Sequence, residues 1–345
     1  MASRPPAAIV LDCEGPLPST EERAFFRDAD PWGFILFARH CENEEAVRAC
    51  CDALRESVGR AAPILIDQEG GRVARMKPPA FAAHPAPGAF GALWRLDPAK
   101  AREAARLNGY LLGRLVGDLG VTVNCAPSLD VAQPGSDPQT LGDRTLASHP
   151  EAVAALGRAV LDGHLAAGVV PVIKHMPGLG RAACDSHLAL PTVCDRLADL
   201  QEIDFAPFKA LCDAPAGMTA HVVYEAIDPD APGTLSRKVV GEVIGGEIAF
   251  DGLLFSDDLK MEALSGSYAD RTRRALDAGC DVAVVCNLTL DQKRDAMDGA
   301  SPLTPQADDR AARAFAMARA RQTKGDVDLA AARADLEALL KPVAA

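Results

Sequence analysis

The chain has 345 residues, of which 48% are hydrophobic, enough to bury one large core or two ordinary ones. Its formal net charge of -12 argues against electrostatic attraction to nucleic acid or to an anionic membrane, so a small polar ligand is the expected partner. The N-terminus lacks a secretory pattern, and the 10 cysteines show no paired CxxC spacing. We therefore expect a cytoplasmic monomer or homodimer whose cysteines stay as thiols, without a cofactor.

Eight short apolar runs, rich in Val, Ile, Leu and Phe, alternate along the chain with stretches typical of helix or loop. The runs cover residues 7–13, 33–38, 62–68, 121–130, 169–177, 217–224, 252–259 and 281–287. Each is too short for a membrane span and has the composition of a strand buried on both faces of a parallel sheet. Amphipathic patterns predict helices over residues 44–59, 97–120, 149–168, 237–250 and 270–279. Gly120, Gly168 and Gly279 follow three of these patterns, where a left-handed residue commonly ends a helix.

This alternation predicts an α/β fold, specifically a (β/α)8 TIM-type barrel. We expect one domain over residues 1–345, with a core over about 7–290 and C-terminal helices over 305–345, because no linker or low-complexity tract divides the middle. Barrel enzymes carry their functional side chains where the strands end, so the polar residues after each run are the candidates.

The third run leads into residues 67–75, which hold Asp67, Arg75 and a further acid and base around a Gly-Gly pair. The glycines allow a sharp turn or a close approach to a ligand. A charged turn with local ion pairs accounts for this segment equally well. After the fourth run, Arg144 lies in a loop where its guanidinium could clamp hydroxyl, carboxylate or carbonyl oxygens.

The fifth run delivers Lys174 and His175 to the mouth of the barrel, and the following loop carries Asp185 and His187 two residues apart. In an extended or turned segment this spacing allows the carboxylate to contact the imidazole, and its charge favours the protonated ring. A histidine tuned in this way can act first as a general acid and then as a general base.

Three alternative roles for this stretch stay open. Residues 178–183 match the dinucleotide pattern GxGxxA, although they do not open directly into a helix. His175, His187 and His221 could bind a metal, although no HxH or HExxH spacing is present. Asp185 could also simply cap a turn, which is the simplest of the three.

The seventh run ends in Asp257 and Asp258, an acidic pair placed where barrel enzymes hold nucleophiles and bases. Either carboxylate could instead cap the next helix. His221 and Asn287, at the ends of the sixth and eighth runs, are expected to line the mouth rather than to serve as satisfied core polar groups.

Together these segments resemble glycoside hydrolase family 3, in its single-domain bacterial β-N-acetylhexosaminidase branch of peptidoglycan recycling. The resemblance runs from about Gly33 to about Asn287 and includes Gly33-Phe34-Ile35-Leu36-Phe37, Asp67-Gln68-Glu69-Gly70-Gly71-Arg72-Val73, Val123-Asn124-Cys125-Ala126-Pro127, Lys174-His175-Met176-Pro177-Gly178, Asp185-Ser186-His187, Thr219-Ala220-His221, Ile227-Asp228-Pro229-Asp230 and Phe255-Ser256-Asp257-Asp258-Leu259. Many separate matches in the same order argue against coincidence.

The resemblance implies a retaining hydrolysis in which Asp257 attacks the anomeric carbon, because the family places its nucleophile immediately after this serine. His187, oriented by Asp185, would protonate the leaving oxygen and later activate water, in place of the usual second carboxylate. No metal or cofactor is implied. The resemblance further implies that N-acetylglucosamine is held by Asp67, Arg75, Arg144, Lys174 and His175.

The chain departs from the family at two positions of its catalytic loop. The family usually reads Lys-His-Phe-Pro-Gly-His-Gly, whereas Met176 here replaces the phenylalanine and Leu179 the second histidine. Neither residue is the expected acid/base, but Leu179 removes a polar group near the mouth. Loop behaviour or the preference for the leaving group could therefore differ.

The resemblance favours an exo-acting enzyme that removes terminal β-N-acetylglucosamine from anhydro-muramyl peptides or related wall fragments. A phosphorylase that passes the sugar to phosphate is a second hypothesis, and product analysis with and without phosphate separates the two. A non-catalytic sugar-sensing barrel is a third, and turnover of a nitrophenyl N-acetylglucosaminide tests it. Insensitivity to a chelator would exclude a metal-dependent hydrolase.

Overall fold

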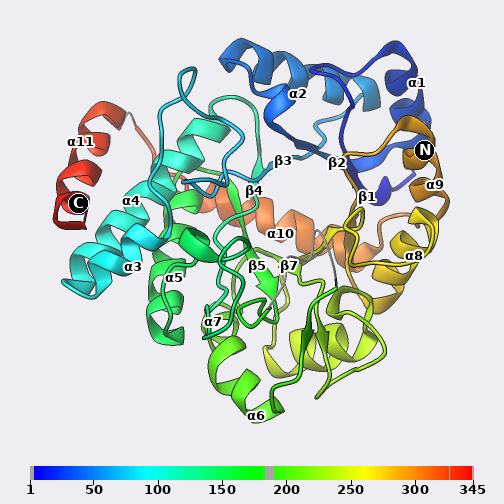
Figure 1. Cartoon of the computed structure of the whole chain (residues 1–345). Helices are drawn as coiled ribbons and strands as arrows, with labels where there is room; N and C mark the ends of the chain where they lie inside the picture. Colours follow the sequence, from blue (N-terminus) through cyan, green and yellow to red (C-terminus); the bar gives the residue numbers. More distant parts are fainter. Residues whose placement is uncertain (1–3, 183–189, 326, 344–345) are drawn as a thin grey trace.

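The computed structural model describes residues 4–182, 190–325 and 327–343, and its centre is a closed barrel of parallel strands (Figure 1). Around the barrel the strands follow the order β1, β10, β9, β7, β5, β4, β3 and β2, which closes on β1. Their bounds are β1 (Ala7–Leu11), β2 (Pro31–Leu36), β3 (Ile64–Ile66), β4 (Val123–Asn124), β5 (Val170–Met176), β7 (Ala216–Thr219), β9 (Leu253–Asp258) and β10 (Val282–Val284). Each predicted run overlaps one of these strands, so the TIM-type barrel is confirmed.

Helices surround the barrel on the outside (Figure 1). The longer ones are α1 (Thr20–Ala29), α2 (Glu44–Val58), α3 (Gly88–Trp94), α4 (Pro98–Gly117), α5 (Pro150–Ala166), α8 (Tyr268–Ala278) and α9 (Leu290–Asp298). Shorter ones are α6 (Leu197–Asp199), η3 (Leu200–Asp204), α7 (Ala206–Ala210), η1 (Ala38–His40), η2 (Gly142–Arg144), η4 (Gly233–Leu235) and η6 (Lys341–Val343). Gly120, Gly168 and Gly279 have φ of 96°, 82° and 118°, as expected for the left-handed residues that follow helices.

Two predicted elements have a different form. The helix expected over residues 237–250 is the π-helix η5 (Lys238–Glu247), in which the amide of Ile248 donates to the carbonyl of Val243, five residues back. The run 217–224 supplies both the end of β7 and a separate strand β8 (Val223–Tyr224), which pairs with β6 (Thr192–Val193) outside the barrel. The barrel strand itself ends at Thr219.

The C-terminal helices α10 (Pro305–Arg321) and α11 (Leu329–Leu340) take different positions (Figure 1). Arg310 of α10 pairs at 3.1 Å with Asp281, which directly precedes β10, so α10 crosses the end of the barrel where the strands begin. Its buried face consists of Ala307, Ala311, Ala314 and Ala318. These small side chains allow the helix to approach the barrel closely. Because α10 covers this end of the barrel, the end left open for a ligand is the opposite one, where the strands finish. Across the described ranges, every helix is too short or too polar to cross a lipid bilayer.

Candidate active site

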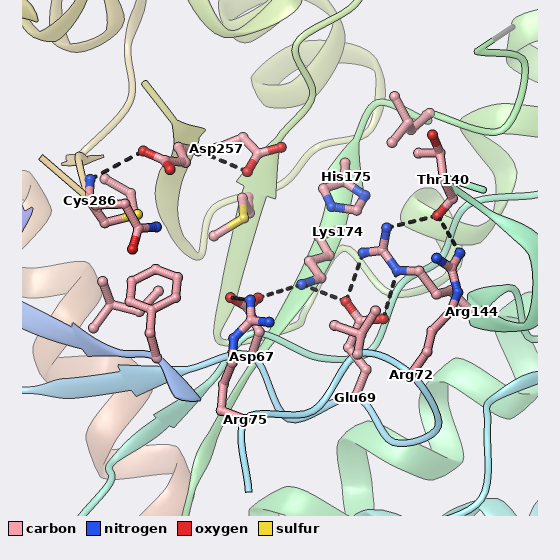
Figure 2. Close-up of a pocket in the computed structure, with 18 of the residues that line it drawn as sticks. Asp67, Glu69, Arg72, Arg75, Thr140, Arg144, Lys174, His175, Asp257 and Cys286 are labelled. Atoms are coloured by element: carbon pink, nitrogen blue, oxygen red, sulfur yellow. Dashed lines mark hydrogen bonds and ion pairs between the residues drawn. The ribbon is translucent and has the colours of Figure 1, made fainter. Parts of the chain in front are cut away.

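A cavity of about 280 Å³ opens at the end of the barrel where the strands finish (Figure 2). Its size lies near the lower end of ligand pockets, which hold roughly 300–1,000 Å³. Six of the eight predicted site residues line it: Asp67, Arg75, Arg144, Lys174, His175 and Asp257. Asn287, also expected at the mouth, lines it as well. The strand ends therefore bring together residues that are far apart in the sequence.

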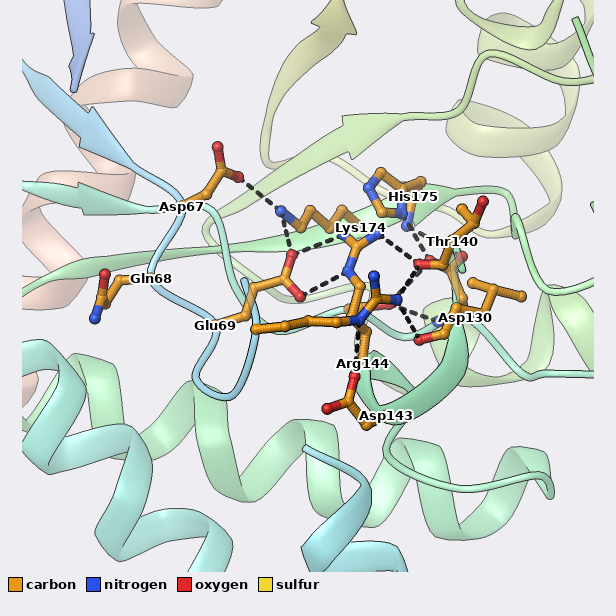
Figure 3. Close-up of polar contacts among 12 residues, drawn as sticks. Asp67, Gln68, Glu69, Asp130, Thr140, Asp143, Arg144, Lys174 and His175 are labelled. Carbon is orange, nitrogen blue, oxygen red and sulfur yellow. Dashed lines mark hydrogen bonds and ion pairs between the residues drawn. The ribbon is translucent and has the colours of Figure 1, made fainter. Parts of the chain in front are cut away.

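Lys174, near the end of β5, is the central cation of the cavity wall (Figures 2 and 3). Its buried Nζ lies 2.8 Å from Asp67 Oδ1 and 2.8 Å from Glu69 Oε1. Burial alone would lower the pKa of Lys174, but the two carboxylates outweigh it and raise that pKa above its usual value. The ammonium group is therefore charged and fixed in direction, which suits it to hold an electronegative oxygen.

Asp67 directly follows β3 and joins two cations. Besides Lys174, it accepts a hydrogen bond at 3.0 Å from Arg75 Nη2, and the Arg75 guanidinium lies over the Phe37 ring at 5.3 Å. Burial raises the pKa of Asp67, but Lys174 and Arg75 bring it well below its usual range. Gln68 fixes the backbone between Asp67 and Arg75, because its side-chain oxygen accepts a hydrogen bond from the amide of Arg75 at 2.8 Å.

Glu69 is a site residue that the sequence did not predict. Its carboxylate accepts from Arg144 Nη2 at 2.8 Å and Nε at 3.1 Å, a two-point pairing, and it also contacts Lys174 (Figure 3). The following turn needs its glycines, because a Cβ at Gly70 would lie 2.4 Å from the Pro85 carbonyl oxygen. The motif that contains Glu69 is visible in the sequence, but residue type alone does not show which way a carboxylate points.

His175 lines the cavity beside Lys174 and is oriented from behind. Its Nδ1 lies 2.6 Å from Oδ2 of the buried Asp130, so the ring donates from Nδ1 and presents Nε2 as its other polar atom. Asp130 also accepts from the amide of Leu179 at 2.7 Å and from the hydroxyl of Ser128 at 2.9 Å. The same carboxylate thus fixes the imidazole and the first part of the loop that follows β5.

Asp257 and Asp258 have different surroundings at the end of β9. Burial raises the pKa of Asp257, but His221, His175 and Lys174, together with the Asp258 amide, bring it below its usual value. Burial and the neighbouring Asp257 raise the pKa of Asp258 to about 6, although its Oδ1 accepts from the amides of Lys260 and Cys286. Asp257 is therefore the readily ionised member of the pair.

The remaining predicted residues have different outcomes. His221 is not among the residues that line the cavity: it is buried, with Nδ1 2.7 Å from the Thr234 hydroxyl and Nε2 2.9 Å from the Asp258 carbonyl oxygen. It supports the backbone that carries the acidic pair, so its expected place at the mouth was wrong. Asp185 and His187 fall in residues 183–189, outside the described part of the chain. Leu179, one of the two departures in the loop, lines the cavity.

The fold and the cavity define a class of protein. It is a barrel whose open end holds a cavity lined by fixed charges, the kind of site in which barrel enzymes bind small polar ligands.

Comparisons with known proteins identify the family. Residues 14–315 match the family described as Glycosyl hydrolase family 3 N terminal domain. A Beta-hexosaminidase of Alkalilimnicola ehrlichii is 41% identical over 285 residues, covering 81% of this chain and 80% of that protein. A Beta-hexosaminidase of Pseudomonas aeruginosa is 37% identical over 283 residues, covering 81% and 82%.

Solved structures agree with this result. The crystal structure of NagZ from Neisseria gonorrhoeae in complex with N-trifluoroacetyl-D-glucosamine has a TM-score of 0.86 and 29% identity, covering 99% of this chain and 100% of that one. The chain belongs to glycosyl hydrolase family 3 and is a glycoside hydrolase.

Proposed function

We propose that this protein is a retaining exo-β-N-acetylglucosaminidase that releases terminal β-linked N-acetylglucosamine from peptidoglycan fragments such as anhydro-muramyl peptides. The names of its relatives support the sugar, because they are called Beta-hexosaminidase. The neighbouring structure from Neisseria gonorrhoeae supports it too, since its ligand is a glucosamine derivative. The cavity of about 280 Å³ favours recognition of one terminal sugar rather than a long chain.

The observation that carries this proposal is the placement of Asp257 opposite the charged wall (Figure 2). Among the described residues, Asp257 forms no ion pair, whereas Asp67 and Glu69 are each held by two cations. A lowered pKa keeps the Asp257 carboxylate ionised, and the Asp258 amide donates to its Oδ1 at 2.8 Å. Oδ2 can therefore serve as the nucleophile.

In the proposed mechanism an oxygen of Asp257 attacks the anomeric carbon while the bond from that carbon to the leaving oxygen breaks. His187 gives its proton to the leaving oxygen, and the sugar stays bound to Asp257 as an ester. Neutral His187 then removes a proton from water, whose oxygen attacks the same carbon and releases Asp257. Asp185 orients His187 and stabilises its protonated form.

The wall residues would hold the sugar through these steps. Lys174, Arg75 and Arg144 donate to sugar oxygens, and Asp67 accepts from hydroxyl groups with its remaining lone pairs. His175 presents Nε2 because Asp130 occupies Nδ1. Since these side chains are already fixed by mutual contacts, the sugar would bind to a preformed surface.

The substrate is tested by comparing the release of N-acetylglucosamine from a defined wall disaccharide with cleavage of nitrophenyl N-acetylglucosaminide and nitrophenyl glucoside. We expect both N-acetylglucosaminides to be cleaved and the glucoside to be a poor substrate. Running each reaction with and without phosphate identifies the acceptor. A sugar phosphate as the main product would make the enzyme a phosphorylase, and the absence of turnover on every substrate would favour a sugar-sensing barrel.

The covalent step is tested by mass spectrometry after incubation with a fluorinated N-acetylglucosaminyl fluoride that slows hydrolysis of the intermediate. We expect one sugar attached to the peptide containing Asp257. A label on another carboxylate would contradict the assignment. We further propose that the enzyme acts in the cytoplasm as a monomer or homodimer and needs no metal, so a chelator should leave its rate unchanged.

A further inference from the structure

A second cluster of reactive side chains lies away from the sugar cavity. Cys13 follows β1, His40 ends η1, and Cys50 lies in α2. All three are buried, and Cys13 Sγ, a His40 ring nitrogen and Cys50 Sγ lie within 4.8 Å of one another. None of the three lines the cavity, so the cluster is a separate site.

Backbone geometry decides which proton His40 carries. The amide of Phe37 donates to His40 Nδ1 at 2.8 Å, so Nδ1 is unprotonated and the neutral ring keeps its proton on Nε2. Nε2 lies 3.5 Å from Cys13 Sγ and 3.1 Å from the Cys13 carbonyl oxygen. A metal ion would need the lone pair of Nε2, whereas in this tautomer Nε2 carries a proton and faces the carbonyl oxygen and the sulfur of Cys13. His40 is therefore a hydrogen-bond donor beside the Cys13 sulfur.

The two cysteines have opposite tendencies to ionise. The contact with Cys50 and the interaction with His40 lower the pKa of Cys13 to about 6, against burial and the charge of Glu22. The pKa of Cys50 is raised, first by its contact with Cys13 and then by burial. The contact between the two sulfurs thus favours ionisation of Cys13 over ionisation of Cys50, the asymmetry found in reactive cysteine pairs. By contrast, burial raises the pKa of Cys51 to about 12.

The Cys13 sulfur lies beneath a segment of the chain that is partly exposed to solvent. Cys13 is buried, but the next residue, Glu14, is exposed, and Gly15 is only partly buried. The Cys13 thiol donates to the carbonyl oxygen of Gly15 at 3.4 Å, so the sulfur packs against this partly exposed segment. A molecule the size of hydrogen peroxide needs a much smaller opening than glutathione does.

We propose that Cys13 and Cys50 are a redox-active thiol pair that hydrogen peroxide converts to an intramolecular disulfide. The Cys13 thiolate attacks one peroxide oxygen, the O–O bond breaks, and hydroxide leaves, which gives a sulfenic acid on Cys13. Cys50 Sγ then attacks the Cys13 sulfur, the S–O bond breaks, and the departing oxygen leaves as water with the Cys50 proton. The two sulfurs together lose two electrons, and one peroxide is reduced to two molecules of water.

The site adjoins the wall of the sugar cavity. Arg39 donates to the carbonyl oxygen of Cys13 at 2.9 Å and to the side chain of Asn287 at 2.8 Å, and it lies over the Phe37 ring at 5.0 Å. Both Asn287 and Phe37 line the cavity. Oxidation at Cys13 would therefore take place one layer behind the wall that faces the ligand.

The test treats the full-length reduced protein with an equimolar amount of hydrogen peroxide and measures intact mass and disulfide-linked peptides. We expect loss of two hydrogen atoms and a single cross-link between Cys13 and Cys50. In Cys50→Ala we expect no cross-link and a sulfenic acid on Cys13, captured when the oxidised protein is unfolded in dimedone. Cys51→Ala is the matched control, because Cys51 is the buried neighbour on the same helix, and it should form the cross-link normally.

A second measurement keeps the proposal testable if a variant folds poorly. When the wild-type protein is treated with hydrogen peroxide and then unfolded in iodoacetamide, Cys13 and Cys50 should escape alkylation while Cys51 is alkylated, by about tenfold or more. Equal alkylation of Cys13 and Cys51, or a cross-link between other cysteines, would overturn the proposal. So would one zinc or copper ion per purified chain that is lost in Cys50→Ala, because the three side chains would then be ligands. Asp257→Asn should form the same cross-link, so this result is independent of the proposed glycosidase activity.

Discussion

The substitution Glu69→Gln tests whether the buried ion network holds the sugar-binding wall together. It keeps the shape of the side chain and removes its charge. Glu69 is 4% exposed and accepts from Arg144 at 2.8 and 3.1 Å, and it contacts Lys174 at 2.8 Å. The variant leaves both largely buried cations, Arg144 and Lys174, with less compensation of their charge.

The expected loss in the free energy of unfolding depends on which contacts of Lys174 and Arg144 remain in the variant. Removing one partner of a buried ion pair costs about 3–5 kcal/mol. Lys174 keeps Asp67 at 2.8 Å, and Arg144 keeps the carbonyl oxygen of Thr140 at 3.0 Å. The loss should therefore be near the lower limit, about 3 kcal/mol, which for a chain of this size lowers Tm by roughly 5 °C. Because the loosened cations are proposed to hold the sugar, KM should rise about tenfold, or ~1.4 kcal/mol.

The assay combines thermal unfolding, followed by circular dichroism at a fixed heating rate, with kinetics on nitrophenyl N-acetylglucosaminide. Asp143→Asn is the matched control, because Asp143 lies in η2 beside Arg144 but pairs with Arg72 at 2.8 Å on the exposed side. Such a surface pair contributes about 1 kcal/mol or less. If Glu69→Gln has the same Tm and the same KM as Asp143→Asn, the ion network does not have the role assigned to it.

Three further predictions concern the acidic residues around the cavity. Asp257→Asn should lower kcat by about 10³-fold or more, which corresponds to ~4 kcal/mol in activation free energy, whereas Asp258→Asn should lower kcat far less. Equal losses of kcat in the two variants would contradict the choice of nucleophile. The acid limit of kcat/KM should lie below the ordinary aspartate pKa of 3.8, because the pKa of Asp257 is lowered, and a limit near pH 6 would instead identify Asp258. Asp130→Asn should raise KM about tenfold through misorientation of His175, or ~1.4 kcal/mol, and unchanged KM would show that this imidazole does not contact the sugar.

The barrel could be predicted because its strands are apolar runs with helices or turns between them. Parallel strands are buried on both faces, so even the short β3 and β4 stand out from their surroundings. The helix α1 was not predicted from periodicity, since TEERAFFRDA is mostly polar, although its capping box is visible as Ser19 and Glu22. The form of η5 could not be predicted either, because a π-helix and an α-helix place apolar residues at similar intervals.

Six residues that line the cavity could be picked out because a barrel brings the ends of its strands to one face, whatever their separation in the sequence. What the pattern could not give was the direction of each side chain. His221 contacts the Thr234 hydroxyl and the Asp258 carbonyl oxygen and does not line the cavity, whereas Glu69, which shortly follows β3, does. Asp130 does not line the cavity but holds His175 from behind, and this contact joins residues that are far apart in the sequence.

The same limit explains why Cys13, His40 and Cys50 were not predicted as a group. They come from the end of a strand, a short 3-10 helix and the middle of α2, so no fixed spacing connects them. Motif searches find ligands that share one local segment, as in CxxC or HExxH. A cluster built from three elements becomes visible only after those elements have packed, and its chemistry then depends on one backbone bond, from the Phe37 amide to His40.

The charges around the cavity also bear on the proposed role of Asp257 as the nucleophile. Asp67 and Glu69 are compensated by Arg75, Arg144 and Lys174, so two acids face three bases and the wall keeps one positive charge in excess. Lys174 of this wall adds to the larger effects of His221 and His175, which together lower the pKa of Asp257 without a direct ion pair among the described residues. A direct pair would occupy a carboxylate oxygen and weaken it as the proposed nucleophile, whereas charges a little farther away keep the carboxylate ionised.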